Sequence, residues 1–371
     1  MPDLAERQQR WLLLALLPGL GPRSLQRLRE HLTDLSQLFD LAPASLRALG
    51  LRPNTLDALQ ELQQGRSELT SRLQVAEDWL ADTDNHVLCL HDPGYPPQLR
   101  EITDPPLVLF VRGNSSLLQD PQLAMVGTRH PSAHGGGTAR AFAEAFVQAG
   151  LTITSGMALG IDAAAHQGAL DGGGQTIAVW GTGLQRCYPK RHAHLAEQIV
   201  EQGGALVSAF WPDMGPQPGQ FPTRNRIISG LSLGTLVVEA SLNSGSLITA
   251  RLALEHNREL FAMPGSIHNP QARGCHRLLR DGAYLVETVQ DVLQVLKLPL
   301  IEALSASQAA EAGPEARKDP LLRWLDTEPV TADWLSLQAD LPIHHVLQRL
   351  LELELEGQVI NSPQGYCRQV T

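Results

Sequence analysis

Short apolar runs rich in β-branched residues alternate with helix-like stretches from residue 123 to residue 295, and this pattern constrains the fold most. The runs expected to form strands are 123–127, 151–156, 176–181, 205–209, 235–240, 259–265 and 283–286. The stretches expected to form helices are 137–150, 160–173, 192–204 and 244–257. Such βαβ alternation is typical of a doubly wound, mostly parallel sheet covered on both faces. We therefore predict an α/β core with an extended Rossmann-like architecture.

Segments of another kind precede this core. Residues 1–72 read as short helices joined by glycine-containing turns, which predicts a helix-hairpin-helix or SAM-like module. Its turn and following helix could hold a nucleic-acid phosphate or serve only packing, and the sequence leaves both readings open. Two further strand-like runs, 86–90 and 107–111, flank a proline-rich loop and extend the core domain to residues 73–300.

The C-terminal part divides in two. Residues 301–319, rich in Ala, Glu and Ser, are expected to be a linker, and residues 320–371 give three helical patterns and a hairpin. This order predicts a winged-helix-like domain. Its third helix carries Glu352, Glu354 and Glu356, so we expect that helix to contact protein and not to read DNA.

Charge and cysteine content limit the classes of function. The chain has a formal net charge of -10, whereas residues 121–295 hold 12 basic and 12 acidic side chains. A polyanion site must therefore be built from a few arginines and backbone amides. The four cysteines lie far apart and form no CxxC pair, which favours a reducing compartment and a cytoplasmic protein. The apolar run 11–17 is too short to cross a membrane.

Small residues follow most of the expected strands at their carboxyl ends, where ligands of doubly wound sheets collect. The four loops are Gly127-Thr128-Arg129, Ser155-Gly156, Gly181-Thr182-Gly183 and Ser244-Gly245-Ser246. Backbone amides in such loops approach phosphates closely, and the positive end of the next helix adds to the attraction. Four loops on one edge predict an anionic ligand.

Familiar cofactor and metal motifs are missing. GTGLQR places Arg186 where a dinucleotide fingerprint needs glycine, and the sequence contains no GxxxxGK[ST], HExxH or clustered Cys/His set. We expect no cofactor and no metal. Asp162 and His166 share a helix face, either as an acid–base pair or as a helix-terminal acid above a packed histidine, and the second reading is favoured. We expect no catalytic residue and no enzyme activity.

The stretch FPTRNRIISG concentrates the groups that would bind a nucleic acid. Arg224 and Arg226 flank Asn225, and arginine forks match phosphate oxygens. Phe221, expected to be exposed, offers a face on which an unpaired base would stack. The competing reading is a structural arginine cluster paired with Glu239 or other acids.

The motifs MVGTR, SGMALGIDAAAH, TIAVWGTGLQRCYP, FPTRNRIISGLS, LVVEA, SGSLITA, FAMPGS and GCHRLLRDGA occur in this order between residues 125 and 283. Together they resemble the DNA-processing protein A family, DprA, also called Smf. The resemblance implies a cytoplasmic, homodimeric protein with no demonstrated catalysis. It implies that the protein protects incoming single-stranded DNA and loads the RecA recombinase during natural transformation and homologous recombination.

The resemblance also implies a DNA-binding site. Its expected residues are Gly127, Thr128, Arg129, Ser155, Gly156, Lys190, Phe221, Arg224, Asn225 and Arg226, and we expect the small-residue loop Ser244, Gly245 and Ser246 to add to the site. Two alternatives stay open at this point. One is a nucleotide-processing enzyme similar to phosphoribohydrolases, against which SGSLIT stands where their PGGxGT run belongs. The other is an adaptor with a vestigial crevice.

Overall fold

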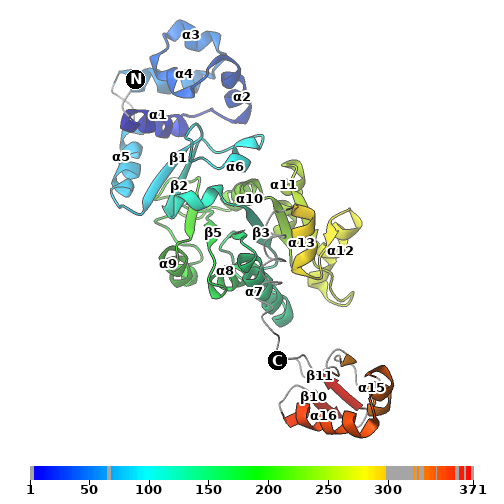
Figure 1. The fold of residues 1–371 in the computed structure, drawn as a ribbon. Coiled ribbons are helices and arrows are strands. Elements are labelled where there is room, and N and C mark those ends of the chain that lie inside the picture. The colour runs from blue at the N-terminus through cyan, green and yellow to red at the C-terminus, as the bar shows by residue number, and fades with distance from the viewer. Residues whose placement is uncertain are drawn as a thin grey trace. The chain divides into compact units, whose positions relative to one another are not determined.

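The computed structural model describes residues 4–64, 68–297, 321, 324–325, 330–339, 341–355, 359–362 and 365–368. These fall into two compact units, Met1–Ile301 and Glu302–Thr371, which are considered separately (Figure 1). The expected linker 301–319 lies outside the described residues, and the boundary expected between residues 72 and 73 stays a prediction because helices and sheet share the first unit.

A nine-stranded sheet forms the centre of the first unit, in the order β1-β2-β6-β5-β4-β3-β7-β8-β9. Its strands are β1 (Asn85–Cys89), β2 (Val108–Gly113), β3 (Gln122–Val126), β4 (Thr152–Ser155), β5 (Thr176–Val179), β6 (Ala205–Ser208), β7 (Gly234–Val237), β8 (Glu259–Ala262) and β9 (Tyr284–Leu285). Along the sheet from β6 to β9, every pair of neighbouring strands is parallel. The antiparallel pairs are β1 with β2 and β2 with β6, so β2 runs against the other strands. The predicted mostly parallel α/β core is confirmed.

Helices cover the sheet as the apolar strands require, because strands buried on both faces need a layer on each. Every residue of β3 to β7 is buried. The helices are α6 (Pro97–Glu101), α7 (Ala133–Gln148), α8 (Ile161–Asp171), α9 (Ala193–Glu201), α10 (Gln220–Leu231), α11 (Ser246–Glu255), α12 (Arg273–Arg280) and α13 (Val289–Leu296). Helices α7 and α8 pack together, as do α10 and α11.

The strand order places a topological switch at β3. Its neighbours are β4 on one side and β7 on the other. The strands that follow β3 in the chain extend the sheet on one side of it, and the strands that follow β7 extend the sheet on the other side. Helix α10 lies in the long crossover that carries the chain from β6 to β7. Such a switch opens a crevice beyond the carboxyl ends of the strands.

The N-terminal helices pack on the β1–β2 end of this unit. They are α1 (Leu4–Leu16), α2 (Pro22–His31), the 3₁₀ helix η1 (Leu35–Asp40), α3 (Pro43–Ala48), α4 (Pro53–Gln63) and α5 (Leu69–Leu80). Helices α2, α3 and α4 begin with proline, whose fixed φ suits that position. Arg72 of α5 forms a two-pronged ion pair with Asp213, and the indole of Trp211 donates to its carbonyl oxygen. These contacts join the helical module to the sheet.

The second unit has its own core. Helices α15 (Ala332–Ala339) and α16 (Ile343–Leu355) pack with a hairpin of β10 (Val359–Ser362) and β11 (Gly365–Arg368), to which Val330 adds a bridge at Tyr366. The buried side chains are Leu321, Leu325, Leu335, Val346, Leu350, Leu353 and Val359. The predicted winged-helix domain and its hairpin are confirmed. Most of the helix expected over 320–326 lies outside the described residues.

Helix α16 also carries apolar side chains on its solvent side. Ile343, Leu347 and Leu351 are exposed and follow one another at four-residue intervals. Among the residues of α16, Arg349 is the single arginine, and the expected protein-contact role stays a prediction. Among the helices that the structure describes, none is both long and apolar enough to span a bilayer.

Candidate nucleic-acid interface

A cavity of 680 Å³ opens at the switch between β3 and β7. We call it the switch-point cavity. It brings together Gly127, Thr128, Arg129, Phe221, Arg224, Asn225, Ser244, Gly245 and Ser246 among the residues expected to bind DNA. Ser155, Gly156, Lys190 and Arg226 do not line it. The crevice predicted from the strand order therefore holds most of the predicted site.

The loop after β3 forms one wall. The backbone amide of Thr128 donates to the carbonyl oxygen of Glu239 at 2.7 Å, which fixes the loop against the end of β7. A Cβ on Gly127 would lie 2.8 Å from that same oxygen, so this close approach requires glycine. Arg129 follows as an exposed residue, and no ion pair or hydrogen bond of its guanidinium is found within the described residues. Its charge is free to meet an anion.

The loop after β7 forms the opposite wall. Gly245 is exposed, and α11 begins at Ser246, so the helix directs its amino end toward the cavity. The hydroxyl groups of Ser244 and Ser246 lie 2.6 Å apart, and the Ser246 amide donates to the Ser244 hydroxyl. A helix amino terminus with nearby hydroxyl and amide donors suits a phosphate.

Glu239 at the end of β7 holds a neighbouring element in place. Its carboxylate accepts hydrogen bonds from the amide and hydroxyl of Ser132 at 2.9 and 2.7 Å, and from the side chain of Asn269 at 3.1 Å. Ser132 is the N-cap of α7. The competing reading proposed that the arginines pair with Glu239 or with other acids. The Glu239 part of it is wrong, because this carboxylate binds Ser132 and Asn269.

Arg224 lies in the floor of the cavity with only 4% of its surface exposed. Its guanidinium donates to the carbonyl oxygens of Gly156 and Val179, at the ends of two neighbouring strands. Burial lowers the pKa of Arg224 to about 10, while the nearby carboxylate of Asp162 acts in the opposite direction. Arg224 thus stays charged at neutral pH and fixes the loops from below.

Asp162 is the buried counterpart of this arginine. Its carboxylate accepts the amides of Gly156 at 3.1 Å and Ala158 at 3.3 Å. Burial raises the pKa of Asp162, and the charge of Arg224 partly offsets that rise. The structural arginine reading therefore applies to Arg224, whose guanidinium binds main-chain carbonyl oxygens and acts electrostatically on the buried Asp162.

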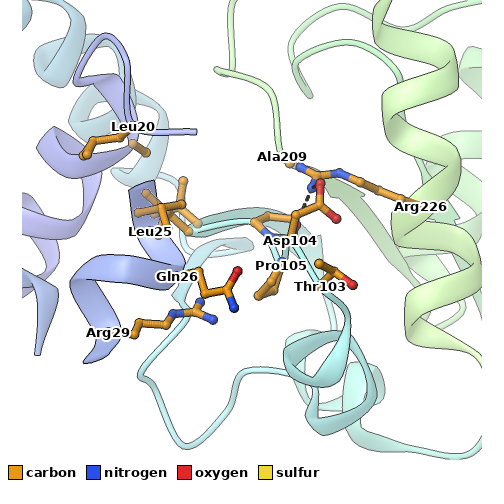
Figure 2. A pocket seen from close by; sticks show the side chains of 13 residues that line it. Leu20, Leu25, Gln26, Arg29, Thr103, Asp104, Pro105, Ala209 and Arg226 are labelled. Carbon is orange, nitrogen blue, oxygen red and sulfur yellow. Dashed lines mark hydrogen bonds and ion pairs between the residues drawn. The ribbon is translucent and has the colours of Figure 1, made fainter. Parts of the chain in front are cut away.

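The prediction that Arg224 and Arg226 face one surface is wrong. Both lie on α10, where successive residues turn by about 100°, so side chains two apart point to nearly opposite sides. Arg226 bonds to the carboxylate and the carbonyl oxygen of Asp104 and lines another cavity (Figure 2). The spacing of Arg224, Ile227, Ile228 and Leu231, all buried, is the helical signal that could have shown this.

Three further predicted residues lie beside or below the cavity. Ser155 is buried, and its hydroxyl donates to the carbonyl oxygen of Met125 at 2.6 Å. Gly156 is buried against Arg224, whose guanidinium carbon would lie 2.8 Å from an added Cβ. Lys190 is exposed at the start of the 3₁₀ helix η3 (Lys190–His192). Ser155 and Gly156 support the floor, and a role for Lys190 stays a prediction.

Two aromatic rings stand together at one end of the cavity. Phe221 is half-buried and not exposed as expected, because its ring packs over Gly181, where a Cβ would approach it to 2.7 Å. Tyr188, 48% exposed, lines the cavity with its ring centroid 5.5 Å from that of Phe221. Sequence reasoning missed Tyr188, although CYP directly follows the GTGLQR loop. The glycines of that loop serve packing.

Asp162 and His166 do not form an acid–base pair. Asp162 bonds to loop amides, whereas Nδ1 of His166 lies 2.7 Å from the hydroxyl of Thr176. That hydroxyl donates to the carbonyl oxygen of Ile153, so Nδ1 of His166 is the donor. Burial lowers the pKa of His166 to about 3. The favoured structural reading of this pair is consistent with these contacts.

Comparison with known proteins shows similarity over nearly the whole chain. The family model described as DNA recombination-mediator protein A matches residues 86–297, and that of the DprA winged helix domain matches residues 305–365. Protein Smf of Escherichia coli (strain K12) is 45% identical over 363 residues, which cover 96% of this chain and 95% of that protein. DNA processing protein DprA of Streptococcus pneumoniae is 46% identical over 202 residues, covering 54% of this chain and 71% of that protein.

Two solved structures are similar as well. The X-ray structure of DNA processing protein A from Streptococcus pneumoniae has a TM-score of 0.65 at 36% identity, covering 76% of this chain and 95% of that one. The structure of DNA processing protein A from Helicobacter pylori has a TM-score of 0.52 at 30% identity, covering 57% and 95% respectively. The Helicobacter pylori structure concerns the single-stranded DNA binding mode of that protein.

Proposed function

The chain belongs to the DNA recombination-mediator protein A family, DprA/Smf, and from this membership we propose that it binds single-stranded DNA in the switch-point cavity. The observation that carries the proposal is the exposed, unpaired Arg129 opposite the amino end of α11, within the described part of the chain. Both attract phosphates, and they stand on two walls of one cavity. A local site of this kind suits a chain with a net charge of -10.

The rings of Tyr188 and Phe221 add a preference for unpaired DNA. Tyr188 presents part of its ring to the cavity, and Phe221 supports it from behind. Bases in a duplex already stack on one another, so an aromatic platform favours a single strand. Arg224 and Asp162 hold the loops at the right separation without contacting the strand themselves.

The strand would be held and not cut. The buried Asp162 is occupied by two loop amides, and His166 lies outside the cavity lining, so neither is placed for proton transfer. We propose that the protein protects incoming single strands in the cytoplasm during natural transformation and passes them to the RecA recombinase. The family description as a recombination mediator supports the second step.

We also propose that the protein acts as a homodimer. A protomer that neutralises about four phosphates gives a salt slope of only about 3 for single strands. Two linked sites on one strand gain from effective concentration. The edge strand β9, with exposed Tyr284 and Leu285, is the self-association surface that we favour. Light scattering of Leu285→Glu beside the unchanged protein tests this, and a dimer of unchanged stability would exclude the β9 surface.

A titration of labelled DNA tests the main proposal. Fluorescence anisotropy compares single-stranded and duplex oligonucleotides of equal length across a salt series. We expect tighter binding of the single strand at every salt concentration. Equal affinity for both forms would overturn the assignment, and release of free base from a nucleotide panel would favour the enzyme alternative. RecA filament growth on the same strand, with and without the protein, tests the loading step.

A further inference from the structure

Two cavities lie on the far side of α10 from the switch-point cavity and meet at Arg29 of α2. One, of 370 Å³, is lined by Gln26, Arg29, Thr103 and Arg226, and the other, of 380 Å³, by Arg29, His91 and Arg100. We call their combined lining the α2–α6 groove. Figure 2 shows Gln26 and Arg29 facing Arg226 and Asp104 across the first cavity.

Two arginines of this groove, Arg29 and Arg100, lack the carboxylate partner that Arg226 and several arginines nearby possess. Arg7, Arg10 and Arg72 each form an ion pair. Arg29, in contrast, is exposed and forms no ion pair or side-chain hydrogen bond with any residue in the described ranges. Arg100 donates to the main-chain carbonyl oxygens of Asp92 and Tyr95. Carbonyl groups carry no formal charge, so they do not compensate the charge of Arg100.

Three acidic side chains near the groove are already paired. Asp104 pairs with Arg226, and Glu101 pairs with Arg258 at 3.1 Å. Asp34 pairs with Arg7 at 3.0 Å. His91 is neutral at pH 7, because burial lowers its pKa. The groove is therefore positive through Arg29 and Arg100, in a segment of the chain that is otherwise acidic.

The shape of the groove suits a chain of anions. Arg29 lines both cavities, so they adjoin at its side chain, and apolar Leu20, Leu25 and Pro105 line part of the first. Such a surface matches spaced phosphates with sugars between them. Helix α10 is the partition, since Arg224 and Asn225 face the switch-point cavity and Arg226 faces the groove.

We propose that the α2–α6 groove is a second site for the phosphodiester backbone of single-stranded DNA, and that it holds nucleotides beyond those in the switch-point cavity. The proposal rests on the proposed function and extends it. The helical module then contributes directly to DNA binding through Arg29, on the flank of its second helix. A strand long enough to pass α10 would occupy both sites, and a short one would fill only the cavity.

Charge reversal at Arg29 tests the groove. The variant is Arg29→Glu, and the matched control is Arg27→Glu, two residues away on α2, exposed and outside both cavities. Each is titrated with oligo-dT of about 8 and about 30 nucleotides, lengths chosen to fill one site or to extend past it. Thermal unfolding of both variants checks that the fold is kept.

We expect Arg29→Glu to bind the long strand several-fold more weakly, with a salt slope lower by about 0.7 for each lost phosphate contact. Its affinity for the short strand stays unchanged, and Arg27→Glu matches the unchanged protein on both. Gln26→Glu, which adds a charge without removing an arginine, shows the same loss to a smaller extent.

If Arg29→Glu and Arg27→Glu bind the long strand with equal affinity, the proposal that the groove binds DNA is wrong. If the switch-point cavity does not bind DNA, the measurements give a different result. In that case Arg129→Ala keeps full affinity for the short strand, whatever the Arg29 variant does with the long one.

Discussion

The guanidinium of Arg224 and the carboxylate of Asp162 lie buried together beneath the switch-point cavity, where Arg224 and Asp162 hold opposite sides of Gly156. Arg224 binds the carbonyl oxygen of Gly156, and Asp162 binds its amide. The loop after β4 is thus fixed at one residue by two buried side chains, one binding its carbonyl oxygen and the other its amide. The arginine most readily assigned to DNA from the sequence therefore acts on the protein.

We expect removal of Arg224 to act mainly on the free energy of unfolding and much less on the contacts with phosphate. Arg224→Ala leaves the buried Asp162 without its counter-charge, at a cost of about 3–5 kcal/mol in the free energy of unfolding. Urea unfolding at neutral pH measures this cost. Arg224→Met combined with Asp162→Asn should be less destabilised than Arg224→Ala, because no charge stays buried alone. If the double variant is the less stable of the two, the charge interaction does not support the loop.

Removing Arg129 should give the opposite result. The side chain is exposed, and no hydrogen bond or ion pair of its guanidinium is found within the described part of the chain, so Arg129→Ala should change the free energy of unfolding little. Loss of one phosphate contact should lower the salt slope by about 0.7 and weaken single-strand binding about tenfold. Anisotropy across a salt series measures both. Arg280→Ala, another exposed arginine but outside the cavity, should bind normally, and equal slopes for the two variants would contradict the assignment.

Tyr188 should act as a stacking surface. Tyr188→Leu keeps apolar volume but removes the ring, and we expect it to weaken binding of oligo-dT by about 1–3 kcal/mol. Tyr188→Phe keeps the ring and should bind almost as well as the unchanged protein. Quenching of tyrosine fluorescence on binding gives a second readout. Loss of affinity in the phenylalanine variant as large as in Tyr188→Leu would instead point to the hydroxyl group.

His166 should make stability fall on acidification. Burial lowers its pKa to about 3 in the folded protein, whereas the unfolded chain binds a proton near pH 6.5. As pH falls below about 6.5, the unfolded state gains a proton that the folded state excludes, and stability falls by up to about 1.4 kcal/mol per pH unit. His166→Asn keeps a donor toward Thr176 and cannot titrate. Urea unfolding from pH 7 to pH 5 should show a shallower decline for this variant, and parallel curves would exclude His166 as the source.

Much of the fold is predictable because buried parallel strands read as uninterrupted apolar runs. The runs containing Ala124, Ile153 and Leu236 are all buried strands. The loops after them carry small residues for a local reason, as at Gly127, where the chain passes close to Glu239. Local patterns of this kind predicted both the sheet and the edge where the cavity lies.

The finer geometry of the site depends on contacts between distant segments. Arg226 finds its partner at Asp104, 122 residues away, and no local pattern indicates that pairing. Tyr188 meets Phe221 only because the loop after β5 and the start of α10 converge in the fold. The orientation of Arg226 relative to Arg224, in contrast, follows from local pattern, since the buried residues 224, 227, 228 and 231 recur at helical spacing.

The two units bury their apolar side chains in separate cores, one around the nine-stranded sheet and one around Leu335 and Val346. Severing the chain between residues 302 and 320 should therefore leave two halves that each fold alone. The DNA affinity of each half, measured alone and with the two halves mixed, would separate the contribution of the sheet from that of the winged helix. No side chain would have to be substituted.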